Sequence, residues 1–204
     1  MQKELIQKRV FTKREAKIME TKVVYKSTLF GREHEISIPY EDLSRHKDSY
    51  LLNRKNFYIP VIVFGFLTFV SYMWRNDKDF QNDLGGYQWI IWGVLFLIST
   101  MVYLLSIENL WKIRVQYNTY LFFFKSIPNK KTVDDFLESL FEERDNYLKE
   151  TYFYKPNKNL TFESQKNNLQ WLRKNEVISG SEFKNGMKEL EEVFNNEQTK
   201  IGFN

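Results

Sequence analysis

Two long stretches without a charged residue interrupt an otherwise polar sequence. The first covers residues 57–74 (FYIPVIVFGFLTFVSYMW) and the second covers residues 87–107 (YQWIIWGVLFLISTMVYLLSI). Each is close to the roughly 20 residues that a helix needs to cross a hydrocarbon core of about 30 Å. Because only residues 75–86 separate them, the pattern predicts a transmembrane helical hairpin with a short connecting loop.

The two flanks of this hairpin carry the alternating pattern of short, half-buried strands. Before the hairpin, strands are predicted at residues 5–12, 22–29, 33–39 and 48–54. After it, residues 110–117 and 119–127 are predicted to pair as a β-hairpin that turns near Asn118. Since isolated hairpins are marginally stable, neither flank is expected to form a good sheet alone. We therefore expect one domain, split in sequence into residues 1–56 and 108–152 and joined in space.

A single amphipathic helix is predicted to close this split domain. Thr132 is the predicted N-cap, and Asp134 and Asp135 lie in the favourable first turn. Up to residue 152, apolar side chains recur on one face, at Val133, Phe136, Leu137, Leu140, Phe141 and Leu148. The expected fold class is α+β: a membrane protein whose helical hairpin is inserted into a small β-domain closed by a C-terminal helix.

A second, shorter helical hairpin is predicted at residues 167–194, after a linker at 153–166 and before a tail at 195–204. Ser179 and Glu182 have the spacing of a capping box that starts its second helix. This unit is too short to bury much apolar surface unaided, so it is expected to need a partner: a second copy, the split domain or another protein. Its candidate partner-binding residues are Leu169, Leu172, Ile178, Phe183, Met187 and Leu190.

The basic residues predict an orientation in the membrane. Thirteen Lys and Arg precede the first apolar stretch and fifteen follow the second, whereas residues 75–86 contain two. By the positive-inside rule both termini are expected in the cytoplasm, with the short loop outside. Six basic residues near the span ends are candidate membrane-surface contacts: Arg45, Lys47, Arg54, Lys55, Lys112 and Arg114.

Residues that carry chemistry are few. The chain has no cysteine and two histidines, His34 and His46, whose spacing fits no zinc motif. No phosphate-binding glycine loop occurs, and basic residues are interspersed with acidic ones rather than forming a nucleic-acid patch. The predicted spans contain no ionisable side chain, which disfavours a transporter, although an oligomeric pore lined by Ser and Thr stays an alternative. We therefore expect a non-enzymatic protein without metal or cofactor.

Three segments resemble a bacterial pleckstrin-homology-like (bPH) domain interrupted by a transmembrane pair. They are the strand-turn-strand at Lys26–Leu43, the aromatic strand at Asn118–Pro128 and the helix at Thr132–Tyr152. This resemblance implies a small bent barrel or sheet sealed by the helix. Residues 167–194 resemble the short C-terminal hairpin called SHOCT, on the match of Ile178, Ser179, Glu182 and Phe183, although Asn175–Glu176 replaces the glycine usual in that family. The resemblance implies a role in assembly.

The leading functional hypothesis is a scaffold or regulatory protein of the bacterial inner membrane. Its expected partners are membrane lipids and either further copies of itself or other membrane proteins, with no nucleic acid. Two alternatives stay open. One is a lipid- or ligand-sensing membrane module, and the other is an accessory subunit of a transporter or an enzyme complex.

Overall fold

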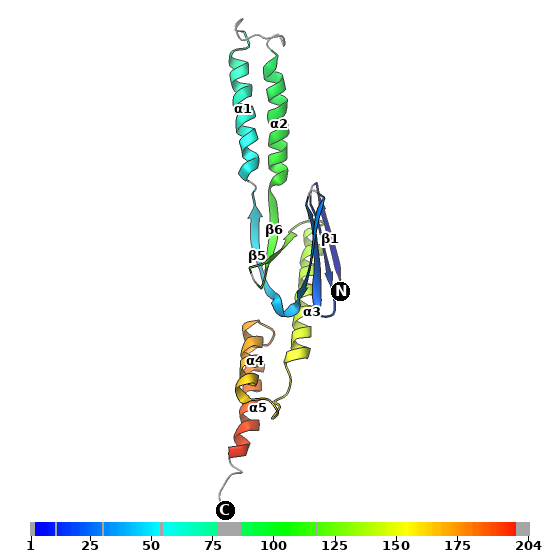
Figure 1. Ribbon diagram of the computed structural model, residues 1–204, viewed down its shortest axis with the longest axis vertical. Coiled ribbons are helices and arrows are strands. Elements are labelled where there is room, and N and C mark those ends of the chain that lie inside the picture. Colours follow the sequence, from blue (N-terminus) through cyan, green and yellow to red (C-terminus); the bar gives the residue numbers. More distant parts are fainter. Residues whose placement is uncertain are drawn as a thin grey trace, which may run out of the picture. The chain divides into compact units, whose positions relative to one another are not determined.

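The computed structural model describes residues 3–10, 12–29, 31–53, 55–76, 87–116 and 118–198, and it is a mixed α and β structure (Figure 1). The chain divides into two compact units. The first comprises residues 1–48 and 111–204, and the second comprises residues 49–110. Each unit is described by itself below.

Four strands before the apolar stretches form one antiparallel sheet in the order β1-β2-β3-β4. Their bounds are Glu4–Arg9, Thr12–Ile18, Lys22–Leu29 and Arg32–Pro39. The expectation that this flank could not form a sheet alone is wrong, because β2 was missing from the prediction. The buried positions of β2 are Thr12, Arg14, Ala16 and Ile18, so only the second half of its buried face is apolar and the alternation is too short to detect.

The remaining strands form a three-stranded sheet in the order β5-β6-β7. Their bounds are Leu43–Leu52, Glu108–Val115 and Tyr120–Phe124. Strand β5 therefore begins before the predicted residue 48, directly after the 3-10 turn η1 at Tyr40–Asp42. The predicted turn at Asn118 is confirmed, since this residue has a φ of 57°, a left-handed conformation that Asn tolerates better than most residues.

Helix α3 (Lys130–Tyr152) confirms the predicted amphipathic helix, but its N-cap is Asn129 and not Thr132. The Asn129 side chain accepts a hydrogen bond of 2.8 Å from the Thr132 amide, so Thr132 lies inside the first turn. The predicted apolar face is buried, apart from the partly buried Phe141. Phe136 packs on Phe123 of β7, with 6.0 Å between the ring centroids.

Contacts inside the first unit join segments that are far apart in sequence. The Gln7 side chain of β1 pairs with the Phe124 backbone of β7, donating to its carbonyl at 2.8 Å and accepting from its amide at 2.9 Å. The Tyr25 hydroxyl donates to the carbonyl of Phe122 at 2.7 Å. Residues on both sides of the apolar stretches therefore share one core.

Two antiparallel helices follow α3: α4 (Phe162–Lys174) and α5 (Gly180–Gln198). Helix α4 begins inside the predicted linker, because Thr161 is an N-cap whose hydroxyl accepts from the Ser164 amide at 3.2 Å. The predicted capping box is confirmed. The Ser179 amide donates to the Glu182 carboxylate at 2.8 Å, and the Glu182 amide donates to the Ser179 hydroxyl at 3.2 Å.

The second unit contains α1 (Tyr58–Met73) and α2 (Gln88–Ser106), two helices that are long and apolar enough to cross a membrane (Figure 1). They lie side by side. A Cβ atom at Gly65 would be 3.2 Å from the Phe96 ring, and Phe64 stacks on Trp92. Most of the predicted connecting loop, residues 77–86, lies outside the described residues.

Hydroxyl groups of α1 and α2 bond to the backbone of their own helix. Thr68 donates to the carbonyl of Phe64 at 2.7 Å, and Thr100 donates to that of Phe96 at 2.8 Å. Ser99 donates to the same Phe96 carbonyl at 2.9 Å. These hydroxyls are satisfied without water or a second helix, as is typical of Ser and Thr in membrane-spanning helices.

Candidate functional site

The six candidate partner-binding residues face the interior of the first unit. Four are buried, at Leu169, Leu172, Ile178 and Leu190, whereas Phe183 and Met187 are partly buried. All six belong to or pack on one apolar cluster that also contains the buried face of α3. The α4–α5 pair therefore uses the split domain of the same chain to cover its apolar side chains.

Arg144 of α3 is fully buried and donates hydrogen bonds to three oxygen atoms. Its Nε donates to the Leu43 carbonyl at 2.7 Å, and its Nη1 donates to the Asp145 carboxylate at 2.5 Å and the Asn175 carbonyl at 3.3 Å. Burial lowers the pKa of Arg144, but the Asp145 charge opposes this shift. The guanidinium stays protonated, because the pKa of arginine lies far above neutrality.

Arg45 of β5 extends the same cluster. Its Nη1 lies 2.9 Å from the Asp145 carboxylate and donates to the Glu176 carbonyl at 3.1 Å. Burial raises the pKa of Asp145, and the charges of Arg144 and Arg45 oppose that rise. We call the set of Arg45, Arg144, Asp145 and the Leu43 carbonyl the arginine socket.

The arginine socket binds the C-terminal end of α4. Here Glu176 adopts a φ of 60°, and the amides of Glu176 and Val177 return to the carbonyls of Arg173 and Leu172 at 3.2 and 3.0 Å. This is a Schellman motif, which leaves the last carbonyls pointing outward. Two arginines therefore bind carbonyl oxygens at the negative end of the helix dipole, where cations are favourable.

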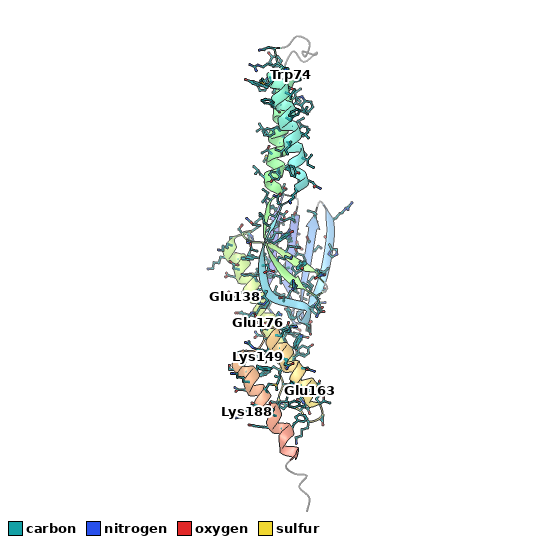
Figure 2. All side chains as sticks on the ribbon, turned by 90° about the vertical axis from the view of Figure 1, so that its left-hand side faces the viewer. Trp74, Glu138, Lys149, Glu163, Glu176 and Lys188 are labelled. Carbon is teal, nitrogen blue, oxygen red and sulfur yellow. The ribbon has the colours of Figure 1, made fainter. Side chains whose placement is uncertain are left out.

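A second polar contact joins α3 to α5. Lys149 and Glu182 form an ion pair. Figure 2 shows Lys149 close to Glu176, whose carbonyl is bound by the arginine socket. Hydrogen bonds from Lys149 and then from Ser179 lower the pKa of Glu182 to about 2. Tyr152 adds an edge-on contact to Trp171, with 5.4 Å between ring centroids. Glu182 therefore caps α5 and holds it to α3 with one carboxylate.

A cavity of about 440 Å³ lies among α4, α5 and the segment that follows α3. Phe153, Leu169 and Leu190 supply its apolar wall, and Asn185 and Glu189 supply polar groups. This size is within the range of small-molecule sites. Lys155 and Glu182 also line the cavity, and the Glu182 carboxylate is already bound by Lys149 and by the Ser179 amide.

A basic groove of about 340 Å³ lies where the β1–β2 and β3–β4 turns meet. Lys8 and Lys13 are direct partners across the β1–β2 pair, an arrangement that repulsion disfavours. Arg9 also lines the groove, and Val10 at the turn is 64% exposed. The sequence prediction missed this site because it placed residues 5–12 in one strand and so did not bring Lys13 beside Lys8.

The candidate membrane-surface residues have different surroundings. Arg45 is in the arginine socket, and Lys47 lies 3.1 Å from Asp134 and 4.8 Å from the centre of the Trp111 ring. Lys112 lies 3.7 Å from the centre of the Tyr120 ring. Arg114 and Lys55 are exposed, and Arg54 lies outside the described residues. Their contact with a membrane surface stays a prediction.

Among the described residues, no group of three His, Asp or Glu side chains could hold a metal ion. His34 and His46 are exposed, and the His46 Nε2 lies 3.5 Å from the Glu176 carboxylate. Searches against protein-family models, curated proteins and solved structures found no match to this chain.

Proposed function

We propose that this chain is an integral membrane protein that acts as a non-enzymatic scaffold or regulator. One observation carries the membrane part. Apolar side chains of α1 and α2 point outward, with Phe66 64% and Leu97 66% exposed. Burying such a side chain yields about 1.5–3 kcal/mol, and a contiguous surface of this kind is rare on a protein surrounded by water. A helix in a soluble core would instead be covered by the rest of the protein.

The proposed location is the inner membrane of a bacterium, with both termini in the cytoplasm and two spans. The distribution of basic residues supports this orientation, since residues 75–86 contain only two. The resemblance of residues 167–194 to a SHOCT hairpin supports a role in assembly, through further copies of the chain or through other membrane proteins. The first unit would then be the cytoplasmic scaffold, carried by the two spans.

Fractionation tests the anchor. The full chain is expected to stay in the membrane pellet after carbonate extraction. A control chain in which a Gly-Ser linker replaces residues 58–106 should move to the supernatant. A full chain that is extracted without detergent would refute the proposal.

The absence of natural cysteine allows a direct test of orientation. Glu20→Cys and Asn76→Cys place single thiols at exposed positions of the first and second unit. On spheroplasts, an impermeant maleimide should label the Asn76 variant at once and the Glu20 variant only after lysis. The reverse pattern would contradict the proposed orientation.

The basic groove favours a second candidate function, recognition of anionic lipid. Lys8 and Arg9, together with Lys13, which is paired with Glu15, place basic side chains beside the exposed Val10, and this combination suits a surface of phosphate groups over an apolar layer. Full-length protein in nanodiscs tests it by hydrogen exchange of residues 8–13. Phosphatidylglycerol discs should slow this exchange relative to phosphatidylcholine discs, and Lys8→Gln with Lys13→Gln should remove the difference. Equal exchange in both lipids would exclude the groove as a lipid site.

A further inference from the structure

One end of the four-stranded sheet, where the β1–β2 and β3–β4 turns lie, carries exposed apolar side chains. Val10, in the β1–β2 turn, is 64% exposed, and Leu29, the last residue of β3, is 37% exposed. Thr12 and Leu29 are direct partners across the β2–β3 pair. Val10, Thr12 and Gly31 line the same groove, so the two turns lie together. Turns favour Gly, Pro, Asn, Asp and Ser, so turn formation alone does not account for Val10.

A buried polar pair separates this apolar patch from the core of the first unit. Gln7 and Arg14 are direct partners across the β1–β2 pair, and both are buried. Gln7 bonds to the Phe124 backbone, and the Arg14 guanidinium carbon lies 4.1 Å from the centre of the Phe124 ring. Leu29 follows the β3 partner of Arg14 by two residues, so it lies on the same face but nearer the turns. Val10 and Leu29 are therefore outside the core cluster and need another apolar environment.

Basic residues flank the two turns: Lys8, Arg9, Lys13 and Arg32. The nearest acidic residues are already paired, Glu15 with Lys13, and Glu33 with Lys26 at 2.6 Å. The ends of the two turns are thus apolar and their rim is basic. This is the composition of protein surfaces that enter the headgroup region of an anionic membrane.

We propose that the β1–β2 and β3–β4 turns insert together into an anionic bilayer. Val10 and Leu29 enter the boundary between the headgroups and the acyl chains, and Lys8, Arg9 and Arg32 bind the lipid phosphates. This inference rests on the proposed membrane anchor and on the lipid-recognition candidate, and it adds a second point at which the chain enters the membrane. The basic rim favours lipid over a protein partner, because an anchored chain has anionic headgroups at high effective concentration.

Depth-dependent quenching tests the insertion, because the chain has no natural cysteine and accepts a single probe. Val10→Cys is labelled with an environment-sensitive fluorophore, and the full chain is reconstituted in phosphatidylglycerol nanodiscs. A lipid with a spin label high on its acyl chain is expected to quench the probe about twofold more strongly than a lipid with a spin-labelled headgroup. The matched control is Glu20→Cys, in the turn between β2 and β3 at the opposite end of the sheet, which neither lipid should quench.

The outcomes separate this inference from the functions on which it rests. Quenching by the headgroup label alone would overturn the insertion, but it would leave lipid recognition by the basic groove standing. Quenching by neither label would also overturn the insertion. If hydrogen exchange of residues 8–13 were then equal in both lipids, the lipid-recognition candidate would fall as well. Carbonate extraction tests the membrane anchor independently of these results.

A probe on the second turn gives another readout. In chains labelled at Leu29→Cys, Val10→Asp places a carboxylate in the apolar layer and should lower quenching by the acyl-chain label severalfold. Val10→Leu should preserve it. Since Val10 is largely exposed, the fold should survive both substitutions, which circular dichroism can check. Unchanged quenching in the Val10→Asp chain would exclude joint insertion of the two turns.

Discussion

The two helical hairpins of this chain, α1–α2 and α4–α5, place their apolar side chains in opposite ways. Helices α1 and α2 expose their apolar side chains and return their hydroxyls to their own backbone. Helices α4 and α5 bury their apolar side chains against each other and against α3, and they expose charged residues. Under the proposed function, the difference follows from the surroundings of each hairpin, lipid for α1–α2 and water for α4–α5.

The helix ends show the same contrast. Thr161 and the Ser179–Glu182 capping box hold the starts of α4 and α5, and a Schellman motif ends α4. The residues at the N-caps of α1 and α2, Phe57 and Tyr87, form no side-chain capping bond. Aromatic residues at such ends are typical of the membrane interface. Four experiments test this contrast between the two hairpins.

The largest effect is expected for Arg144→Met. The substitution leaves Asp145 without its buried partner and removes donors from the carbonyls of Leu43 and Asn175. Breaking a buried pair of this kind costs about 3–5 kcal/mol in unfolding free energy. Chemical denaturation of the full chain in detergent, followed by tryptophan fluorescence, measures the loss. Lys184→Met on the exposed face of α5 is the control and should change the free energy little. A loss below about 1 kcal/mol would show that the guanidinium is dispensable.

A charge on the exposed face of α2 is expected to have the next largest effect. Leu97→Arg places a cation near the middle of the proposed span, at a cost of about 2.5–3.5 kcal/mol for insertion. The variant should show reduced recovery in the membrane pellet, whereas Leu97→Met should behave as the natural chain. Glu192→Arg on the exposed face of α5 is the matched change in the other hairpin and should leave recovery unaltered. Equal recovery of all three variants would argue against lipid around α2.

A smaller loss is expected for Ser179→Ala, which removes the hydroxyl that caps α5. Loss of an N-cap costs about 1 kcal/mol. Thr68→Ala in α1 removes a hydroxyl that only bonds back to its own helix, so it should cost less. Thermal unfolding of both variants in the same detergent compares them, and a larger loss for the Thr68 variant would reverse the interpretation of the two hairpins.

The smallest effect concerns pH. The pKa of Glu182 is lowered to about 2 in the folded chain, below its usual value of 4.5. A lowered folded pKa contributes stability above the unfolded value, and this contribution is lost as pH falls from about 4.5 to about 2. The Lys149–Glu182 contact should therefore weaken in that range. Crosslinking efficiency between α3 and α5, introduced at positions other than this pair, should fall with acid in the natural chain. Glu182→Gln should show a weaker contact at neutral pH and less change on acidification.

Local patterns in the sequence determined much of this architecture. The charge-free stretches predicted α1 and α2, the apolar stripe predicted α3, and the Ser179–Glu182 spacing predicted the start of α5. The left-handed turn at Asn118 was equally local. Each of these features depends on residues within a few positions of one another, so their spacing alone carries the information.

Features that depend on contacts between distant parts of the chain could not be predicted from local patterns. Strand β2 was not predicted because two of its four buried positions hold the polar Thr12 and Arg14, which are tolerated there only because other residues cover them. Arg144 was not singled out by the sequence analysis, yet it is buried where Leu43 and Asn175 supply oxygen atoms from 101 and 31 residues away. A buried charge is tolerated only where hydrogen-bond partners surround it, and a local sequence pattern does not show which distant residues supply those partners.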